Sequence, residues 1–468
     1  MTDPVLYAPQ EPIFPRRVTG VFRRLKWWIM GVTLGIYYLT PWIRWDRGPS
    51  LPDQAVLIDM VTKRFYFFWI EIWPHEFYFV AGLLIMAGLG LFLFTSALGR
   101  VWCGYTCPQT VWTDLFILVE RWIEGDRNAR VRLYHGKWNP RKWRLRLTKW
   151  AVWLVISVVT GGAWVFYFTD APTLLGDLGN FAAHPVAYGT IAALTATTFV
   201  FGGFMREQVC IYMCPWPRIQ AAMMDPDTIT VAYREWRGEP RGKPREDAKG
   251  DCIDCMACVN VCPMGIDIRD GQQMECITCA LCIDACDDVM DKIGKPRGLI
   301  DYLALSDEPA ERAGQPPQRV WKHVLRPRTL IYTALWASIG VGLLYALFIR
   351  SDIELTVSSV RNPTYVLQSD GAVRNIYDVR LRNKAGQDRL FSLGLTSDET
   401  LRIDLEGAAG TRTVVVPADT TILQRVYVTA RPQDPASSAN ATDLRLWVED
   451  VAADIRASKS TTFNGRVQ

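Results

Sequence analysis

Twelve cysteines carry the clearest chemistry in this chain of 468 residues, and all of them lie between Cys103 and Cys286. Eight form two runs with the spacing C-x-x-C-x-x-C-x-x-x-C, namely Cys252, Cys255, Cys258, Cys262 and Cys276, Cys279, Cys282, Cys286. Four more form two C-x-x-x-C-P units, Cys103 with Cys107 and Cys210 with Cys214. A secreted scaffold would spread its cysteines along the chain as disulfides, so this clustering favours metal ligands.

The two longer runs match the bacterial ferredoxin pattern, in which a tight C-x-x-C-x-x-C loop holds three corners of a cubane. In two-cluster ferredoxins the fourth cysteine comes from the other run, so we expect two [4Fe–4S] clusters with crossed ligands. One ligand set is Cys252, Cys255, Cys258 and Cys286, and the other is Cys276, Cys279, Cys282 and Cys262. The alternative is structural zinc, but zinc modules usually separate four ligands into two pairs.

The C-x-x-x-C-P units offer a second thiol site. Positions i and i+4 of a helix share one face, so Cys103 and Cys107 should point the same way, as should Cys210 and Cys214. Four converging thiolates would suit Cu(I), zinc or an iron–sulfur cluster, and a disulfide is disfavoured in a reducing cytoplasm. The alternative is that these cysteines are small buried apolar side chains. Two copies beside a ferredoxin module favour a redox or metal role.

Five charge-poor apolar segments must position these thiols. They lie at about 27–43, 77–98, 150–169, 186–205 and 329–349. Each approaches the ~20 residues that a helix needs to cross ~30 Å of hydrocarbon. The second and fourth segments each end just before a C-x-x-x-C-P unit. We therefore expect a five-helix membrane bundle that brings both units to the same membrane face.

Basic residues orient this bundle. Residues 99–149 hold eleven Lys and Arg, whereas residues 170–184 hold none. The positive-inside rule then places the N-terminus, the 99–149 loop and the ferredoxin module in the cytoplasm. The tail then falls on the outer side, and we expect a bacterial inner membrane with the tail in the periplasm.

The domain organisation follows from these segments. We expect a multi-domain membrane protein with these parts: an N-terminal cytoplasmic segment (1–26), four helices with the 99–149 loop (27–234), a dicluster module (235–300), a linker (301–328), a fifth helix (329–349) and a β domain (351–468). In the tail, apolar and polar residues alternate in short runs separated by turn residues, which predicts an all-β immunoglobulin-like sandwich.

The remaining polar residues give weaker signals. His75 and His184 fall at the outer ends of two helices, where a haem pair is one alternative and interfacial side chains are the other. His135 and His323 lie in basic loops and are expected to be solvated. The same holds for the two carboxylates Asp114 and Glu120 in the amphipathic stretch 108–124. A formal charge of +4 gives no reason to expect nucleic acid as a partner.

The order of these parts resembles the FixG family, also called RdxA or CcoG. The resemblance is carried by residues 99–116 (GRVWCGYTCPQTVWTDLF), residues 210–218 (CIYMCPWPR), the doubled ferredoxin cysteines and the β-sandwich tail. It implies a membrane polyferredoxin that is accessory to the cbb-type cytochrome c oxidase and reduces Cu(II) to Cu(I). It also implies that Cys103, Cys107, Cys210 and Cys214 handle copper or pass electrons out.

The resemblance further implies copper chaperones or oxidase assembly factors as partners, in addition to the lipid bilayer. Two other functions remain open, a quinol-linked electron relay to a periplasmic reductase and a non-catalytic assembly scaffold. The sequence names no electron donor, and it leaves a homodimer open.

Overall fold

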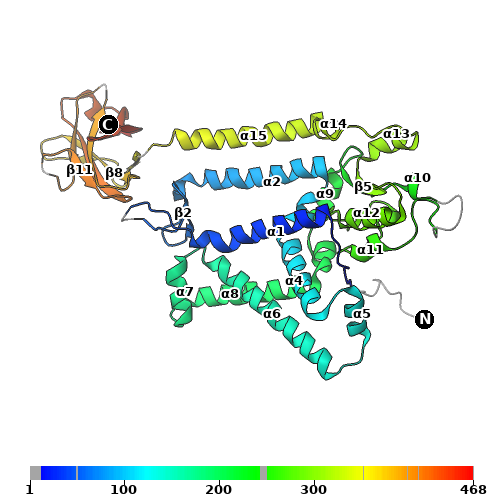
Figure 1. The fold of residues 1–468 in the computed structure, drawn as a ribbon. Coiled ribbons are helices and arrows are strands. Elements are labelled where there is room, and N and C mark those ends of the chain that lie inside the picture. Colours follow the sequence, from blue (N-terminus) through cyan, green and yellow to red (C-terminus); the bar gives the residue numbers. More distant parts are fainter. Residues whose placement is uncertain are drawn as a thin grey trace, which may run out of the picture. The chain divides into compact units, whose positions relative to one another are not determined.

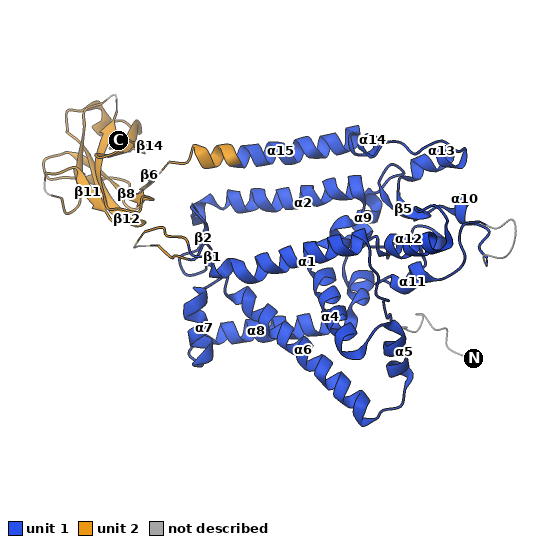
Figure 2. Cartoon of the chain, in the orientation of Figure 1, with its two compact units in different colours: residues 1–44, 54–343 blue, residues 45–53, 344–468 orange. Residues whose placement is uncertain are grey.

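The computed structural model describes residues 12–48, 51–242, 250–351, 353–397, 399–408 and 410–466. The chain divides into two compact units (Figure 2), residues 1–44 with 54–343 and residues 45–53 with 344–468. The first unit contains every cysteine and the apolar helices, except for residues 344–348 at the end of the last one, and the second unit contains a β domain.

Within the described residues, four helices are long and apolar enough to cross a membrane (Figure 1). These are Pro74–Leu98, which includes α2 (Tyr78–Leu98), α6 (Pro140–Val165), Pro185–Met205, made of α8 (Pro185–Thr198) and the π-helix η3 (Phe199–Met205), and α15 (Pro327–Phe348). Proline stands in the first turn of α6 and α8, where its missing N–H costs nothing. These helices indicate association with a membrane.

The first expected span, at about 27–43, does not meet this description. Its segment forms α1 (Val21–Leu39), which begins six residues earlier than expected and carries Arg23, Arg24 and Lys26 in its first two turns. These charges leave too short an apolar stretch for a helix of membrane composition. Helix α1 packs against α6 and α12.

Small residues let the long helices pack closely. A Cβ at Gly82 of α2 would lie 2.6 Å from the Leu343 side chain of α15. A Cβ at Gly161 of α6 would lie 2.9 Å from the Ile191 carbonyl oxygen of α8. Glycine at these two positions therefore allows backbones to approach, as is common between membrane helices.

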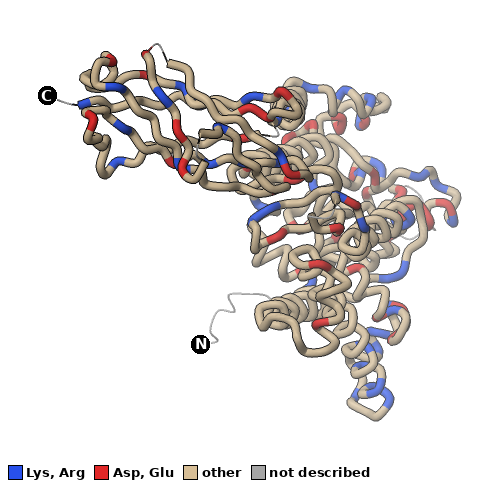
Figure 3. Tube along the Cα trace, turned by 90° about the vertical axis from the view of Figure 1, so that its left-hand side faces the viewer, with Lys and Arg blue, Asp and Glu red and all other residues tan. Residues whose placement is uncertain are grey.

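Shorter elements surround the bundle. They are α3 (Val101–Tyr105), α4 (Pro108–Glu124), α5 (Arg127–His135), α7 (Ala171–Gly179), η4 (Val209–Met213) and α9 (Trp216–Met223), with a three-stranded sheet of β1 (Val56–Asp59), β2 (Arg64–Phe67) and β3 (Ile70–Ile72). Lys and Arg gather at the tip formed by α5 and the start of α6 (Figure 3).

The ferredoxin module is framed by β4 (Thr230–Tyr233) and β5 (Ile300–Leu303), which pair antiparallel with Thr230 opposite Leu303. Between them lie α10 (Glu235–Gly238), α11 (Ala257–Val261) and α12 (Leu281–Ile293). Residues 243–249 lie outside the described residues. The stretch 301–328 is more ordered than expected, because it forms the end of β5, α13 (Glu308–Arg312) and α14 (Val320–Val324).

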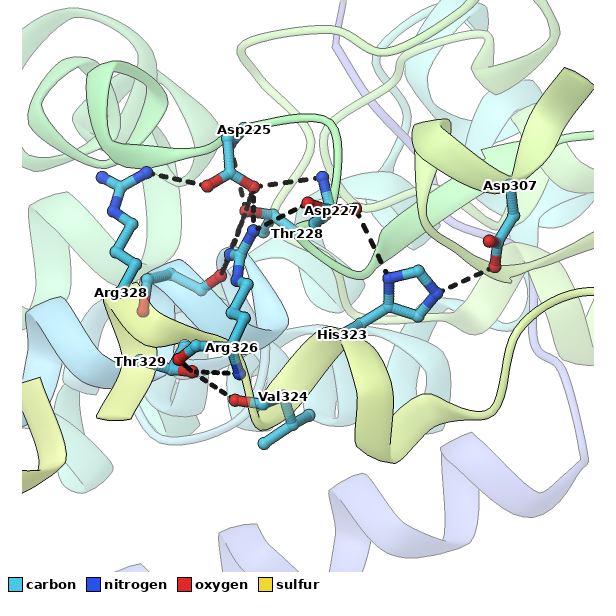
Figure 4. A network of polar contacts seen from close by, with 10 residues as sticks. Asp225, Asp227, Thr228, Asp307, His323, Val324, Arg326, Arg328 and Thr329 are labelled. Carbon is cyan, nitrogen blue, oxygen red and sulfur yellow. Dashed lines mark hydrogen bonds and ion pairs between the residues drawn. The ribbon is translucent and has the colours of Figure 1, made fainter. Parts of the chain in front are cut away.

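An arginine cluster fixes the start of α15 (Figure 4). Arg326 pairs with Asp225 and donates to Thr228 Oγ1 at 3.3 Å and to the Ser96 carbonyl at the end of α2. Arg328 Nη1 lies 2.9 Å from the second oxygen of Asp225. The loop after α9, the end of α2 and the start of α15 are thereby held together.

His323 was expected to be solvated, and this expectation is wrong. The side chain is 5% exposed, and its Nε2 lies 2.9 Å from Asp307 Oδ2 while its Nδ1 lies 3.7 Å from Asp227 Oδ1 (Figure 4). Burial is possible because two carboxylates supply the partners that water would otherwise supply.

The second unit consists of two antiparallel sheets. One has the order β10-β12-β8-β6 with β7 paired to β8, and the other has the order β11-β9-β13-β14. The strands are β6 (Ile353–Ser359), β7 (Val366–Leu367), β8 (Val373–Asn383), β9 (Arg389–Thr396), β10 (Leu401–Leu405), β11 (Thr413–Val416), β12 (Thr421–Ala430), β13 (Thr442–Asp450) and β14 (Arg456–Phe463). Alternate residues of both sheets, such as Tyr377 and Phe391, form one buried core, as the alternating sequence predicts.

The carboxylates of α4 are buried, contrary to the expectation that they are solvated. Asp114 pairs with Arg23 and Lys26 of α1. Glu120 pairs with three cations: Arg130 of α5, Lys149 of α6 and Arg206 after η3. Because α4 lies among four basic elements, its carboxylates neutralise cations that burial would otherwise make costly.

Replacing Glu120 by Gln should therefore destabilise the protein. Burial opposes ionisation, but Arg206, Arg130 and Lys149 hold the pKa of Glu120 at about 2, below its ordinary value of 4.5. The ion pairs of Glu120 therefore contribute to the free energy of unfolding at pH 7, and this contribution is lost as the pH falls from about 4.5 towards 2. We expect E120Q to lose about 3 kcal/mol, measured as a lower thermal unfolding midpoint in detergent. The exposed E235Q should leave the midpoint unchanged, and equal midpoints for both variants would contradict a stabilising role.

Candidate iron–sulfur and thiol site

The two cysteine runs adopt the same unusual backbone. Asp254 and Met256 of the first run have φ of 56° and 58°, and the corresponding Thr278 and Ala280 of the second run have 56° and 59°. Residues with side chains rarely occupy this left-handed region, and strained backbone of this kind clusters at functional sites. The repeat curls both loops in the same manner, as wrapping around a compact inorganic group requires.

One group of thiols joins the first run to the end of the second. Burial, and after it the neighbouring thiols, raise the pKa of the Cys286 thiol to about 12. Those neighbours are Cys258, Cys255 and Cys252. Cys286 lies on α12, which packs against α11, so a residue 28 positions after Cys258 is brought beside it.

In the second group of thiols the two runs exchange roles, because the end of the first run joins the second run. Cys262 ends α11, and its pKa is raised to about 12 by burial and by Cys279 and Cys276 of the other run. Cys282 is partly buried, and it lies beside the same thiols and also beside Cys258 of the first group. The two groups of four therefore adjoin each other.

This donor set suits two cubanes. Eight thiols in two adjoining groups of four supply the soft ligands that iron–sulfur clusters require, and they lose their protons when metal binds. Backbone N–H groups of Met264 and Ile266 point at the Cys262 sulfur, which favours its thiolate form. No three Cys, His, Asp or Glu side chains of the described residues converge as they would around one metal ion. The thiolates of a cubane bind four different irons and stand further apart.

The C-x-x-x-C-P units are not continuous helices, contrary to the expectation that each pair shares one helix face. Cys107 caps α4 with φ −57° and ψ 128°, and Cys214 follows η4 with φ −81° and ψ 119°. Both precede a proline, whose ring disfavours the helical conformation of the preceding residue. Each proline thus breaks the helix at the second cysteine of its unit.

The four thiols nevertheless line one small pocket, together with Met264 and Met274. The four are Cys103, Cys107, Cys210 and Cys214. Burial, and after it the neighbouring thiols of the same set, raise the pKa of Cys103 and of Cys210 to about 12. The Cys103 thiol also donates to Gln220 Oε1 at 3.2 Å.

Sequence reasoning missed the two methionines. Met264 comes two residues after Cys262, and Met274 comes two residues before Cys276, so both belong to the loops that carry the second thiol group. Their nearness to those cysteines was the available signal. Thioethers are soft ligands of the same class as thiolates.

The thiol pocket adjoins the second cysteine loop directly. A Cβ at Gly104 of α3 would lie 2.6 Å from the Ile277 carbonyl oxygen and 3.1 Å from Cys279 Cα. The Tyr105 hydroxyl donates to the Cys279 carbonyl at 3.2 Å. The buried Arg100 donates to the carbonyl oxygens of Met274 and Cys276. Helix α3, which carries Cys103, is therefore docked on this loop backbone to backbone.

The other candidate residues lie apart from this site. His184 caps the start of α8, where its Nδ1 accepts from the Val186 N–H at 3.3 Å. His75 lies in the short helix η2 (Pro74–Glu76), just before α2. Cys103 and Cys210 come after the other ends of these two helical segments.

The two ferredoxin-type cysteine loops at the ends of apolar helices define the class of this protein. This is an iron–sulfur electron-transfer protein associated with a membrane. Family models agree in three places. One described as "4Fe-4S dicluster domain" matches residues 205–305, one described as "4Fe-4S binding domain" matches 79–127, and one described as "IG-like fold at C-terminal of FixG" matches 343–466.

Similarity to known proteins extends over almost the whole chain. RdxB of Cereibacter sphaeroides is 70% identical over 466 residues, 98% of each chain. RdxA of the same organism is 66% identical and covers 96% of each chain. The nitrogen fixation protein FixG of Rhizobium meliloti is 56% identical, covering 98% of this chain and 94% of its own length. The chain belongs to the FixG/Rdx family.

The contact at Gly104 can be tested by adding one methyl group. We expect G104A to push α3 away from the second loop and to lower bound iron from about eight towards about four atoms per chain. A methyl group at Gly162 would meet nothing within 4 Å, so G162A is the matched control. Iron analysis and EPR of anaerobically purified protein are the measurements. If G104A keeps the iron and the spectrum of G162A, the contact does not support the site.

Proposed function

We propose that the protein reduces Cu(II) to Cu(I) in the pocket of Cys103, Cys107, Cys210 and Cys214, and that the Cu(I) serves assembly of a cbb-type cytochrome c oxidase. One observation carries the proposal. Four thiols and two thioethers line a single pocket that touches the second ferredoxin loop. When bound, two [4Fe–4S] clusters supply one-electron transfer, held by the two crossed groups of cysteines.

The donor atoms of the pocket match the product of this reaction. Thiolate and thioether sulfurs prefer Cu(I), so ligand preference and reduction act in the same direction. Each Cu(II) takes up one electron, which a cytoplasmic or membrane-bound reductant supplies to the protein. Copper enters as a substrate and leaves as Cu(I) to a copper chaperone or an oxidase assembly factor.

The short path from the module to the pocket supports electron exit at this place. Cys279 belongs to the second thiol group, and its backbone touches Gly104, the neighbour of Cys103. The same loop supplies Met274 to the pocket wall. No large domain movement is needed to bring the two thiol sites together.

Orientation is part of the proposal. The basic tip of α5 and α6 (Figure 3) favours the cytoplasmic side of a bacterial inner membrane for the thiol pocket and the module. The β domain would then be periplasmic and free to bind oxidase assembly factors, and a homodimer is compatible with this arrangement.

Replacing the four pocket cysteines by serine should separate copper chemistry from the clusters. We expect dithionite-reduced protein to lose at least about tenfold in its rate of Cu(II) reduction, because serine is a poor ligand for Cu(I). The rate is followed with a Cu(I)-specific chelating dye under anaerobic conditions. Iron content is the internal control and should stay at the wild-type value.

An unchanged rate in the quadruple variant, with its iron retained, would remove these thiols from the reaction. A wild-type protein that holds iron but reduces no Cu(II) would point instead to a relay or to an assembly scaffold.

Deletion of residues 351–468 should impair oxidase maturation and leave Cu(II) reduction intact.

Copper retention should also depend on pH. The pKa values of Cys103 and Cys210 near 12 mean that both are protonated at neutral pH, so binding Cu(I) must release protons. We expect the affinity for Cu(I) to rise between pH 6 and pH 8 by up to about tenfold per pH unit for each thiol that binds. Competition with a calibrated Cu(I) chelator measures this. A flat pH profile would show that no protonated thiol takes part.

A further inference from the structure

A basic cavity lies between the start of α1 and the exposed side of α4, apart from the thiol pocket. Its volume is about 810 Å³. Four arginines and two tryptophans make up most of its wall, namely Arg17, Arg23, Arg24, Arg121, Trp27 and Trp122. No carboxylate is among the residues that line it.

The positive charge of this cavity is only partly neutralised within the described part of the chain, by Asp114, which pairs with Arg23. No ion pair involves Arg17, Arg24 or Arg121 there. Arg23 pairs through Nη1 with Asp114 at 3.0 Å, but its buried Nη2 has no hydrogen-bond partner among the described residues. A buried donor without a partner is costly, so the cavity is complementary to an anion with several acceptor oxygens.

The lowered pKa of Arg121 shows that these cations repel one another. Burial and the nearby charges of Arg23 and Arg130 lower the pKa of Arg121 to about 10, and this effect outweighs the opposing one of Asp114 and Asp126. A bound anion would relieve this repulsion and also complete the hydrogen bonding of Arg23 Nη2.

The apolar part of the cavity suits a lipid. Trp122 is 78% exposed and stands on α4 one turn after the exposed Leu118. On α1 the residues that follow Trp27 include the exposed Trp28, Val32 and Ile36, which form an apolar stripe leading away from the arginines. Tryptophan next to arginine at the beginning of an apolar stripe is typical of the headgroup level of a membrane.

We propose that this cavity binds the phosphodiester headgroup of an anionic phospholipid, in the leaflet on the side of the ferredoxin module. The arginines contact the phosphate oxygens, and the acyl chains lie along α1 and Trp122. Clusters of Lys and Arg next to apolar or amphipathic helices recognise anionic headgroups in this manner.

The cavity is linked to the ferredoxin module through α1. The backbone N–H groups of Phe22 and Arg23 donate to the Asp284 carboxylate on α12, at 3.2 and 2.7 Å. Helix α12 also carries Cys282 and Cys286. A lipid held by Arg23 therefore anchors the module to the membrane surface at a point next to two cluster ligands.

Native mass spectrometry of the full, cluster-loaded chain in detergent tests this site. Phosphatidylglycerol should bind at least about tenfold more tightly than phosphatidylcholine with the same acyl chains. Arg17 and Arg24 are exposed, so R17Q/R24Q should fold, and it should weaken phosphatidylglycerol binding by about 30-fold. The matched control R141Q/R144Q removes two exposed arginines of α6 that lie outside the cavity, and it should bind phosphatidylglycerol like the wild type.

Three results would overturn the proposal. They are equal binding of the two lipids, equal losses in R17Q/R24Q and in R141Q/R144Q, and displacement of phosphatidylglycerol by inorganic phosphate at a similar concentration. The last would make a soluble anion the ligand.

Discussion

The close approach of α3 to the second cysteine loop is the constraint on which the account of this protein depends. Gly104 has no side chain, so the Ile277 carbonyl and the Cys279 backbone can lie against α3. Arg100 secures the same contact by donating to two carbonyls of the loop. A soluble-type module and a thiol pocket at the ends of membrane helices thereby become one continuous site. Without this contact the two thiol sites would be separate features of one chain.

Buried ion pairs hold the elements around this site. Glu120 gathers cations from α5, α6 and the segment after η3, which leads directly to Cys210. Asp114 gathers two cations of α1, and Arg326 ties the start of α15 to the end of α2. Such pairs are individually weak sources of stability, but breaking one leaves an uncompensated buried charge. Their main effect is therefore to determine which elements pack together, and their net contribution to the stability of the fold is smaller.

The sequence predicted the features that depend on local spacing. The cysteine runs, four of the apolar helices and the alternating strands of the β domain all follow from short periodic patterns. Burial could not be predicted in the same way, because it depends on what packs on a residue. Glu120 and His323 each stand next to a basic residue in sequence and become buried only through partners from other elements. The prediction that Cys103 and Cys107 share one helix face was also wrong. The i, i+4 rule does not hold there, because Pro108 breaks the helix at Cys107.

The central claim is that eight cysteines hold two clusters that move single electrons to the thiol pocket. Iron analysis combined with EPR on anaerobically purified protein tests it most directly. The account predicts about eight irons per chain, no zinc, and on reduction the broadened spectrum of two neighbouring, magnetically coupled [4Fe–4S] centres. A colourless protein without iron, or one that holds zinc instead, would contradict it.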